Sequence, residues 1–279
     1  MGLKMIVLVK QVPDTSNITD NAMKEDGTVN REALPAIINP EDLCALEEAL
    51  KIKETIGGEI TVISMGPPKA EDALRYCLAM GAHRAILLSD RKFAAADTLA
   101  TSYTLTKAIE KVGDFDLILC GRQAIDGDTA QVGPQVAEKL SINQFTFVQE
   151  IIEITNQEIV VKREIPGGYE IAKAPLPILL TITKESNIPR PPSVKRATAV
   201  KALRAQAPEE KKQKGISIEL WDHKYIGAQE DRCGLKGSAT RVKKVESVVL
   251  TTREVREYSC TIESIKDLVQ GLVKEHILG

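Results

Sequence analysis

Residues 121–134, GRQAIDGDTAQVGP, place glycine, aspartate, threonine and glutamine between an apolar run and an amphipathic run. The apolar run, FDLILC, reads as a buried strand, and the run that follows reads as a helix. Gly121 would let the backbone leave the strand tightly, and Asp126-Gly127 is a turn pair in which glycine can supply a positive φ. Ligands of open α/β sheets bind where strands end, so this stretch predicts a ligand site.

The same stretch suggests a phosphate as ligand. Asp128 and Gln131 have the spacing of a capping box, which would place Thr129 in the first helical turn beside unpaired N–H groups. Such groups and the helix dipole favour a phosphate, the dipole alone by about 0.3–1 kcal/mol. Gly133 is small enough for close approach. Two alternatives stay open: a capped junction without a ligand, or Mg²⁺ held by the two aspartates, which the capping role of Asp128 disfavours.

Other strand ends add less specific candidates. Lys10 could reach a phosphate or be a solvated strand end, and Met65 could cover an adenine or fill the core. Cys120 has no histidine nearby in sequence and reads as a buried thiol. No nucleophile–base–acid set is visible, so no catalytic residue is predicted. The absence of G-x-G-x-x-G and Walker A motifs argues against a standard Rossmann dehydrogenase or a P-loop NTPase.

Alternating strands and helices must position these residues. Apolar runs without polar alternation predict a parallel sheet covered on both faces, a doubly wound α/β fold. The strands are expected at 5–9, 59–65, 84–89 and 115–120, and the helices at 39–58, 69–80, 96–112 and 129–140. The first helix is well marked: Asn39 can cap it, Pro40 suits its first position, and Glu41 and Asp42 complement its dipole.

The pattern changes after residue 140. Runs at 145–154, 158–165, 169–174 and 177–183 predict an antiparallel addition to the same sheet. We expect a nucleotide-binding domain over 1–184, a proline-rich and basic exposed loop over 185–214, and a C-terminal arm over 215–279 that leans on a partner or on the main domain.

Composition narrows the function classes. The 37 basic and 39 acidic residues give a net charge of −2, which predicts no attraction to nucleic acid or to a membrane surface. The basic run 195–214 lacks aromatics for base stacking. Five scattered cysteines and three distant histidines predict neither a disulfide framework nor a metal site, and suit a cytoplasmic protein. The N-terminal apolar run reads as a buried strand, not a signal peptide.

Several motifs together resemble one family, the β subunit of electron transfer flavoproteins. They cover nearly the whole chain and include VLVKQVPD, NPEDLCALEEALKIKE, VISMGPPKAEDALRYCLAMGAHRAI, GRQAIDGDTAQVGPQVAEKL, REIPGGYE, LPILLTITKESNIPRPP and GSATRVKKV. The resemblance implies an adenosine-phosphate-binding domain of the adenine nucleotide α-hydrolase-like kind. It also implies an electron carrier whose α subunit supplies a homologous domain and a mobile FAD domain.

The resemblance also implies site residues. Carried over by position, the nucleotide site comprises Leu8, Asn39, Pro40, Glu41, Asp42, Met65, Gly121, Arg122, Gln123, Ala124, Ile125, Asp126, Gly127, Asp128, Thr129, Ala130, Gln131 and Val132. Housekeeping members hold AMP there as a structural ligand, whereas electron-bifurcating members hold a second FAD and bind NADH against it. The run DGDTAQVGP resembles the bifurcating type.

The bifurcating reading implies partners. NADH would deliver a hydride to this FAD, one electron would go to ferredoxin or flavodoxin, and the other would pass through the α-subunit FAD to a dehydrogenase. The segment after Ile182 corresponds to the loop that docks on an acyl-CoA dehydrogenase, an acyl-CoA reductase or a lactate dehydrogenase, with Val194 as the inserting residue. A disordered linker would suit its composition equally.

Three alternatives remain at this stage. They are a housekeeping form with AMP, a universal-stress-type nucleotide-binding module, which shares the strand–helix alternation, and a structural subunit that holds AMP alone. In the bifurcating interpretation the chain oxidises NADH only together with its α subunit. The stretch beyond Val245 matches the family poorly, and we expect it to contact the α subunit.

Overall fold

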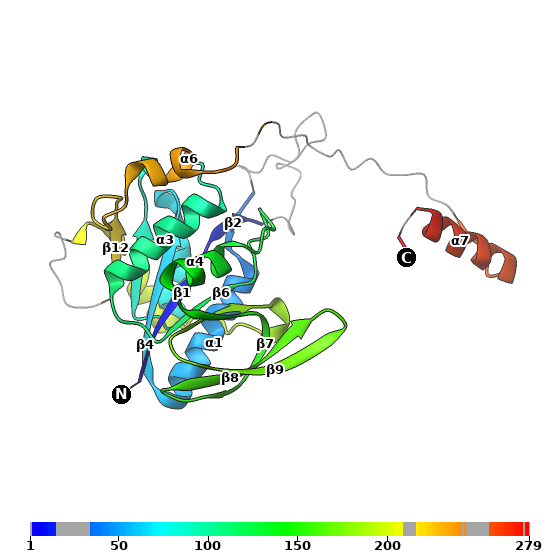
Figure 1. Ribbon diagram of the computed structural model, residues 1–279, viewed down its shortest axis with the longest axis horizontal. Helices are drawn as coiled ribbons and strands as arrows, with labels where there is room; N and C mark the ends of the chain where they lie inside the picture. Colours follow the sequence, from blue (N-terminus) through cyan, green and yellow to red (C-terminus); the bar gives the residue numbers. More distant parts are fainter. Residues whose placement is uncertain are drawn as a thin grey trace.

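The computed structural model describes residues 2–14, 34–208, 216–241, 243, 257–275 and 277–278. In this part of the chain, ten strands form one sheet in the order β11-β12-β5-β4-β1-β6-β10-β7-β8-β9. Figure 1 shows helices on both faces of the sheet, as expected for a doubly wound α/β fold.

The predicted alternation of strands and helices is confirmed. The parallel strands are β1 (Leu3–Leu8), β4 (Gly58–Met65), β5 (Arg84–Leu88) and β6 (Leu117–Gly121). The helices are α1 (Pro40–Ile56), α2 (Glu71–Met80), α3 (Thr98–Val112) and α4 (Val132–Leu140). Pro40 opens α1 as predicted, and Gly57 ends it with φ 77°.

Two apolar clusters cover the two faces of the sheet. Residues of α1 and α2 pack on one face and residues of α3 and α4 on the other. Ala45 and Ala49 of α1 have no exposed surface. Because they are small, α1 and its first turn can approach the strands closely.

The second half of the sheet differs from the prediction in one strand. Strand β8 (Glu158–Ile165) pairs antiparallel with β7 (Asn143–Ile154) and with β9 (Gly168–Pro175), as predicted. The fourth predicted antiparallel strand, β10 (Ile178–Ile182), instead pairs parallel with both β6 and β7. Its five residues are all buried, which is the pattern of a central parallel strand.

Residues after 184 do not form only a loop and an arm. Helix α5 (Val194–Val200) packs against α2, and the Arg196 side chain donates hydrogen bonds to the carbonyl oxygens of Leu78 and Ala82. Strand β12 (Ile218–Trp221) pairs with β5, and β11 (Ala205–Gln206) pairs with β12. The expectation of a loop at 194–206 is therefore wrong, although most of these residues are exposed as expected and Val200 alone among them is buried. Residues 218–221 lean on the main domain, which is one of the two outcomes expected for the C-terminal segment. Residues 209–215 lie outside the described part.

Short elements complete the structure. Strands β2 (Gln11–Pro13) and β3 (Ala36–Ile38) pair antiparallel, and turns of 3-10 helix lie at Pro68–Ala70, Arg91–Phe93, Lys184–Ser186 and Glu230–Arg232. Helix α6 (Gly234–Gly237) follows, and α7 (Ile262–Lys274) stands apart from the sheet with no buried residue (Figure 1). Among the described residues, no helix is both long and apolar enough to span a bilayer.

Candidate functional site

The carboxyl ends of three neighbouring strands place the predicted site residues at one edge of the sheet. Strand β1 lies between β4 and β6 and is parallel to both. The segments that begin at Lys10, after Met65 and at Gly121 therefore leave the sheet side by side. Leu8 and Met65 belong to the apolar cluster on the α3 and α4 face, Leu8 buried and Met65 half-buried.

The first turn of α1 lies against the segment that leaves β6. Asn39 occupies the N-cap position as predicted, but its side chain makes no capping hydrogen bond. It instead accepts the N–H of Ile125 at 3.1 Å and donates to the carbonyl oxygen of Gln123 at 2.8 Å. Glu41 accepts the N–H of Gln123 at 2.9 Å. The capping prediction for the Asn39 side chain is therefore wrong, because the neighbouring segment takes both of its polar atoms.

Asp42 joins the ends of β1 and β6. One carboxylate oxygen accepts the N–H of Gly121 and the other accepts the N–H of Lys10, both at 2.8 Å. Burial raises the pKa of Asp42 to about 7, although these hydrogen bonds lower it. A Cβ at position 121 would lie 2.6 Å from Asp42 Oδ1 and 2.7 Å from Glu41 Cβ, so glycine is required for this close approach.

The segment between Asp126 and Gln131 is not helical. Asp128 and Ala130 adopt positive φ values of 47° and 53°, and α4 begins only at Val132. The predicted capping box is wrong, because a backbone with two left-handed residues cannot form the first turn of a helix. Asp128 instead accepts a hydrogen bond from the Gln123 side chain, and it takes the positive φ that was expected of Gly127.

The N-terminus of α4 has no side-chain cap. The backbone N–H groups of residues 129–133 donate no hydrogen bond to any described residue. The Gln131 side chain turns toward α3, where it accepts a hydrogen bond from Thr98 at 2.8 Å. Strained, exposed backbone in front of unpaired helical N–H groups fits an anionic group such as a phosphate.

Lys10 is paired with an acidic residue of the same site. Its ammonium lies 2.7 Å from both carboxylate oxygens of Asp126. Asp126 and Asp128 thus have different partners and do not converge. Among the described residues, no three histidine, cysteine or acidic side chains are grouped so as to hold a metal ion.

Arg122 and Phe147 form a contact that the sequence does not indicate. The Arg122 guanidinium lies 3.0 Å from Glu41 and 5.6 Å from the centre of the Phe147 ring. Phe147 has φ 59° beside a register shift of β7 against β10, so a bulge turns its ring toward Arg122. Such a bulge leaves no sequence signal here, since neither glycine nor proline marks it.

Cys120 is buried at the end of β6, as predicted, and burial raises the pKa of its thiol. Its Sγ contacts the carbonyl oxygen of Leu180, and the described residues place no histidine among its hydrogen-bond partners. A buried thiol with a raised pKa is a poor nucleophile.

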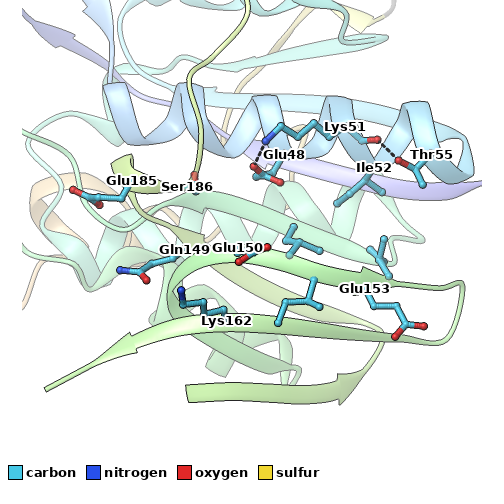
Figure 2. Close-up of a pocket in the computed structure, with 13 residues that line it drawn as sticks. Glu48, Lys51, Ile52, Thr55, Gln149, Glu150, Glu153, Lys162, Glu185 and Ser186 are labelled. Atoms are coloured by element: carbon cyan, nitrogen blue, oxygen red, sulfur yellow. Dashed lines mark hydrogen bonds and ion pairs between the residues drawn. The ribbon is translucent and has the colours of Figure 1, made fainter. Parts of the chain in front are cut away.

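A cavity of about 800 Å³ lies elsewhere, between α1 and the β7–β8 hairpin (Figure 2). Glu48, Lys51 and Ile52 of α1 face Glu150 and Lys162 across it. Its charges are of both signs, and Glu48 is already paired with Lys51 at 2.8 Å. None of the predicted nucleotide-site residues lines this cavity.

Comparison with known proteins gives one consistent result. The electron transfer flavoprotein domain matches residues 26–209. The electron transfer flavoprotein subunit beta of Thermoanaerobacterium thermosaccharolyticum is 45% identical over 99% of this chain and 100% of that protein. Protein FixA of Rhizobium meliloti is 41% identical over 97% and 90%. The caffeyl-CoA reductase-Etf complex subunit CarD of Acetobacterium woodii is 46% identical over 86% of each chain.

Proposed function

The chain belongs to the electron transfer flavoprotein family as a β subunit, and on that premise we propose that it binds an adenine nucleotide at the carboxyl ends of β1, β4 and β6. The observation that carries this proposal is the strained segment Asp128–Ala130 in front of the uncapped α4. Backbone strain of this kind persists where the surrounding structure imposes it, and it gathers at ligand sites.

Different residues at this sheet edge would bind the phosphate and the adenosine of the nucleotide. The N–H groups of residues 129–133 suit a phosphate or diphosphate, and the Thr129 hydroxyl is exposed beside them. Met65, which is half-buried, offers apolar surface for the adenosine, and Leu8 is buried in the same apolar cluster. Lys10 can leave its ion pair with Asp126 and bind a phosphate instead, because both side chains are partly exposed.

We further propose FAD as the nucleotide and electron bifurcation as the activity. The support is the run DGDTAQVGP, which resembles bifurcating members of the family. When bound, the flavin would accept a hydride from NADH and release electrons singly, to ferredoxin or flavodoxin and to the FAD of the α subunit. The role of the protein would be to position the flavin. The segment 126–131 would hold the diphosphate, and burial of Leu8 and of the strand ends would exclude water from the sheet side of the site. A housekeeping form with AMP is the second candidate, since the loop geometry suits AMP equally.

The partners are an α subunit of the same carrier and a dehydrogenase or reductase. One relative is named as a subunit of a caffeyl-CoA reductase-Etf complex, which favours an acyl-CoA dehydrogenase or reductase over a lactate dehydrogenase. Val194 is 82% exposed at the start of α5, as an inserting residue must be. The universal-stress-type alternative is set aside, because the family assignment extends far beyond residue 140.

The nucleotide content of the purified complex tests the proposal. The chain is produced with its α subunit, the complex is denatured, and the released nucleotides are separated and counted. Bifurcation predicts two FAD per heterodimer and bleaching of the flavin by NADH without oxygen. One FAD and one AMP would replace the bifurcating proposal with the housekeeping form, and a complex without nucleotide at this edge would overturn both.

A further inference from the structure

The backbone that leaves β6 is hydrogen-bonded on alternate residues to the first turn of α1. The N–H groups of Gly121, Gln123 and Ile125 point to α1, and that of Arg122 points the other way, to the carbonyl oxygen of Ile182 in β10. The acceptors on α1 are, in the same order, the side chains of Asp42, Glu41 and Asn39. This alternation is that of an extended strand, so three side chains take the place of a neighbouring strand.

The polar atoms of these side chains have partners within the protein. Both oxygens of Asp42 accept backbone N–H groups, and both polar atoms of Asn39 bind backbone. Glu41 divides its oxygens between the N–H of Gln123 and the guanidinium of Arg122. All three residues are buried. Because these side chains are buried and bonded to the segment, their polar atoms are poorly accessible to a ligand.

Most backbone N–H groups between residues 121 and 128 are already paired, and among the described residues those of Ala124 and Asp126 have no hydrogen bond. The N–H groups of Gly127 and Asp128 both donate to the carbonyl oxygen of Ala124. The run of unpaired N–H groups begins with Thr129, as described above.

We infer that Asn39, Glu41 and Asp42 are positioning residues, which fix the backbone of residues 121–125 so that residues 129–133 face the nucleotide. Contact with the phosphate then falls to the second half of the stretch. The inference rests on the proposed function, because it concerns the same site. It differs from the residue set that the family resemblance implies, in which Asn39, Glu41 and Asp42 belong to the nucleotide site itself.

Amide hydrogen exchange and AMP binding test the inference together. The full-length chain is purified with its α subunit and freed of nucleotide, and AMP is used as the probe. Asn39→Ala and Glu41→Ala should speed exchange of the amides at 121–125 at least about fivefold and weaken AMP binding about five- to tenfold, as expected for one lost hydrogen bond or two. Glu41→Gln should restore both, since an amide oxygen still accepts the N–H of Gln123.

The matched control is Asn187→Ala. The Asn187 side chain also bonds to α1, through the carbonyl oxygen of Cys44, but it lies on a different segment. This variant should leave exchange at 121–125 and AMP affinity unchanged. The inference is overturned if exchange at 121–125 keeps its normal rate in Asn39→Ala and Glu41→Ala, even where AMP binding is lost, because direct contact would then explain the loss. If the unmutated chain binds neither AMP nor FAD, the proposed function is wrong. The exchange rates at 121–125 would still test whether Asn39 and Glu41 fix this backbone segment.

Discussion

The ammonium of Lys10 lies 2.7 Å from both carboxylate oxygens of Asp126. This ion pair joins the segments that leave β1 and β6. The two side chains are 48% and 25% exposed, so the pair contributes little to stability, about 0–1 kcal/mol. Its importance is for binding, because Lys10 follows β1 at the sheet edge where the phosphate is proposed to bind.

The pair predicts opposite effects for its two members. Lys10→Gln should weaken AMP binding by about threefold to tenfold, since an exposed cation near a phosphate contributes modestly. Asp126→Asn should leave AMP binding unchanged or tighten it, because it releases Lys10. Titration calorimetry at low and high salt measures both. Equal weakening by the two variants would mean that the pair only shapes the loop.

Thr129→Val tests the phosphate contact. Loss of the hydroxyl should weaken retention of the nucleotide about tenfold to a hundredfold, because a hydrogen bond to a charged group contributes about 1.5–3 kcal/mol. Thr55→Val is the matched control, because Thr55 is exposed and its hydroxyl bonds within α1. Nucleotide released on denaturation is compared between the two purified complexes. Equal retention would remove Thr129 from the site.

Gly121→Ala should destabilise the protein by about 1–3 kcal/mol, as overpacking of a buried contact does. The added Cβ would meet Asp42 Oδ1 at 2.6 Å and the Asp42 backbone nitrogen at 2.8 Å. Gly168→Ala is the control, because no atom lies within 4 Å of a Cβ there and it should change stability by less than about 1 kcal/mol. Urea unfolding compares them, and equal midpoints would contradict the close packing of α1 on this strand end.

The raised pKa of Asp42 makes stability depend on pH. Its folded value of about 7 exceeds the ordinary 3.8, so the folded chain binds more protons between these values. The free energy of unfolding should therefore fall by about 1.4 kcal/mol per pH unit across this window and level off above it. The difference between the normal chain and Asp42→Asn isolates this contribution in urea titrations from pH 4.5 to 8. Parallel curves for the two proteins would show that Asp42 is ionised throughout.

Val194→Asp should impair transfer to the dehydrogenase without changing the nucleotide site. A charge at an apolar contact is expected to raise the KM for the partner at least tenfold, and Val194→Leu should keep it near normal. Flavin reduction by NADH should be the same in all three proteins. An unchanged KM in Val194→Asp would place the docking surface elsewhere.

The sequence predicted the fold well where the residue pattern alone decides it. The apolar runs of β1, β4, β5 and β6 can be buried only between two layers of helices, and Pro40 and Gly57 mark the ends of α1 by their backbone preferences. It failed for β10, whose neighbours in sequence are antiparallel strands. Whether such a run joins the hairpin or the parallel strands depends on which edge of the sheet is open, and adjacency in the chain does not tell this.

For the candidate site, too, the sequence predicted which residues take part but not which residues they contact. The residues of the stretch 121–134 and their place after a strand follow from local pattern and from family resemblance. Their partners do not: Asp128 has the spacing of a helix cap but is left-handed and bonded to Gln123, and Asn39 holds Ile125, 86 positions away, instead of its own helix. A capping residue can satisfy its own helix or a passing backbone segment. Only the close approach of α1 to the end of β6, which the bare Gly121 permits, decided between them.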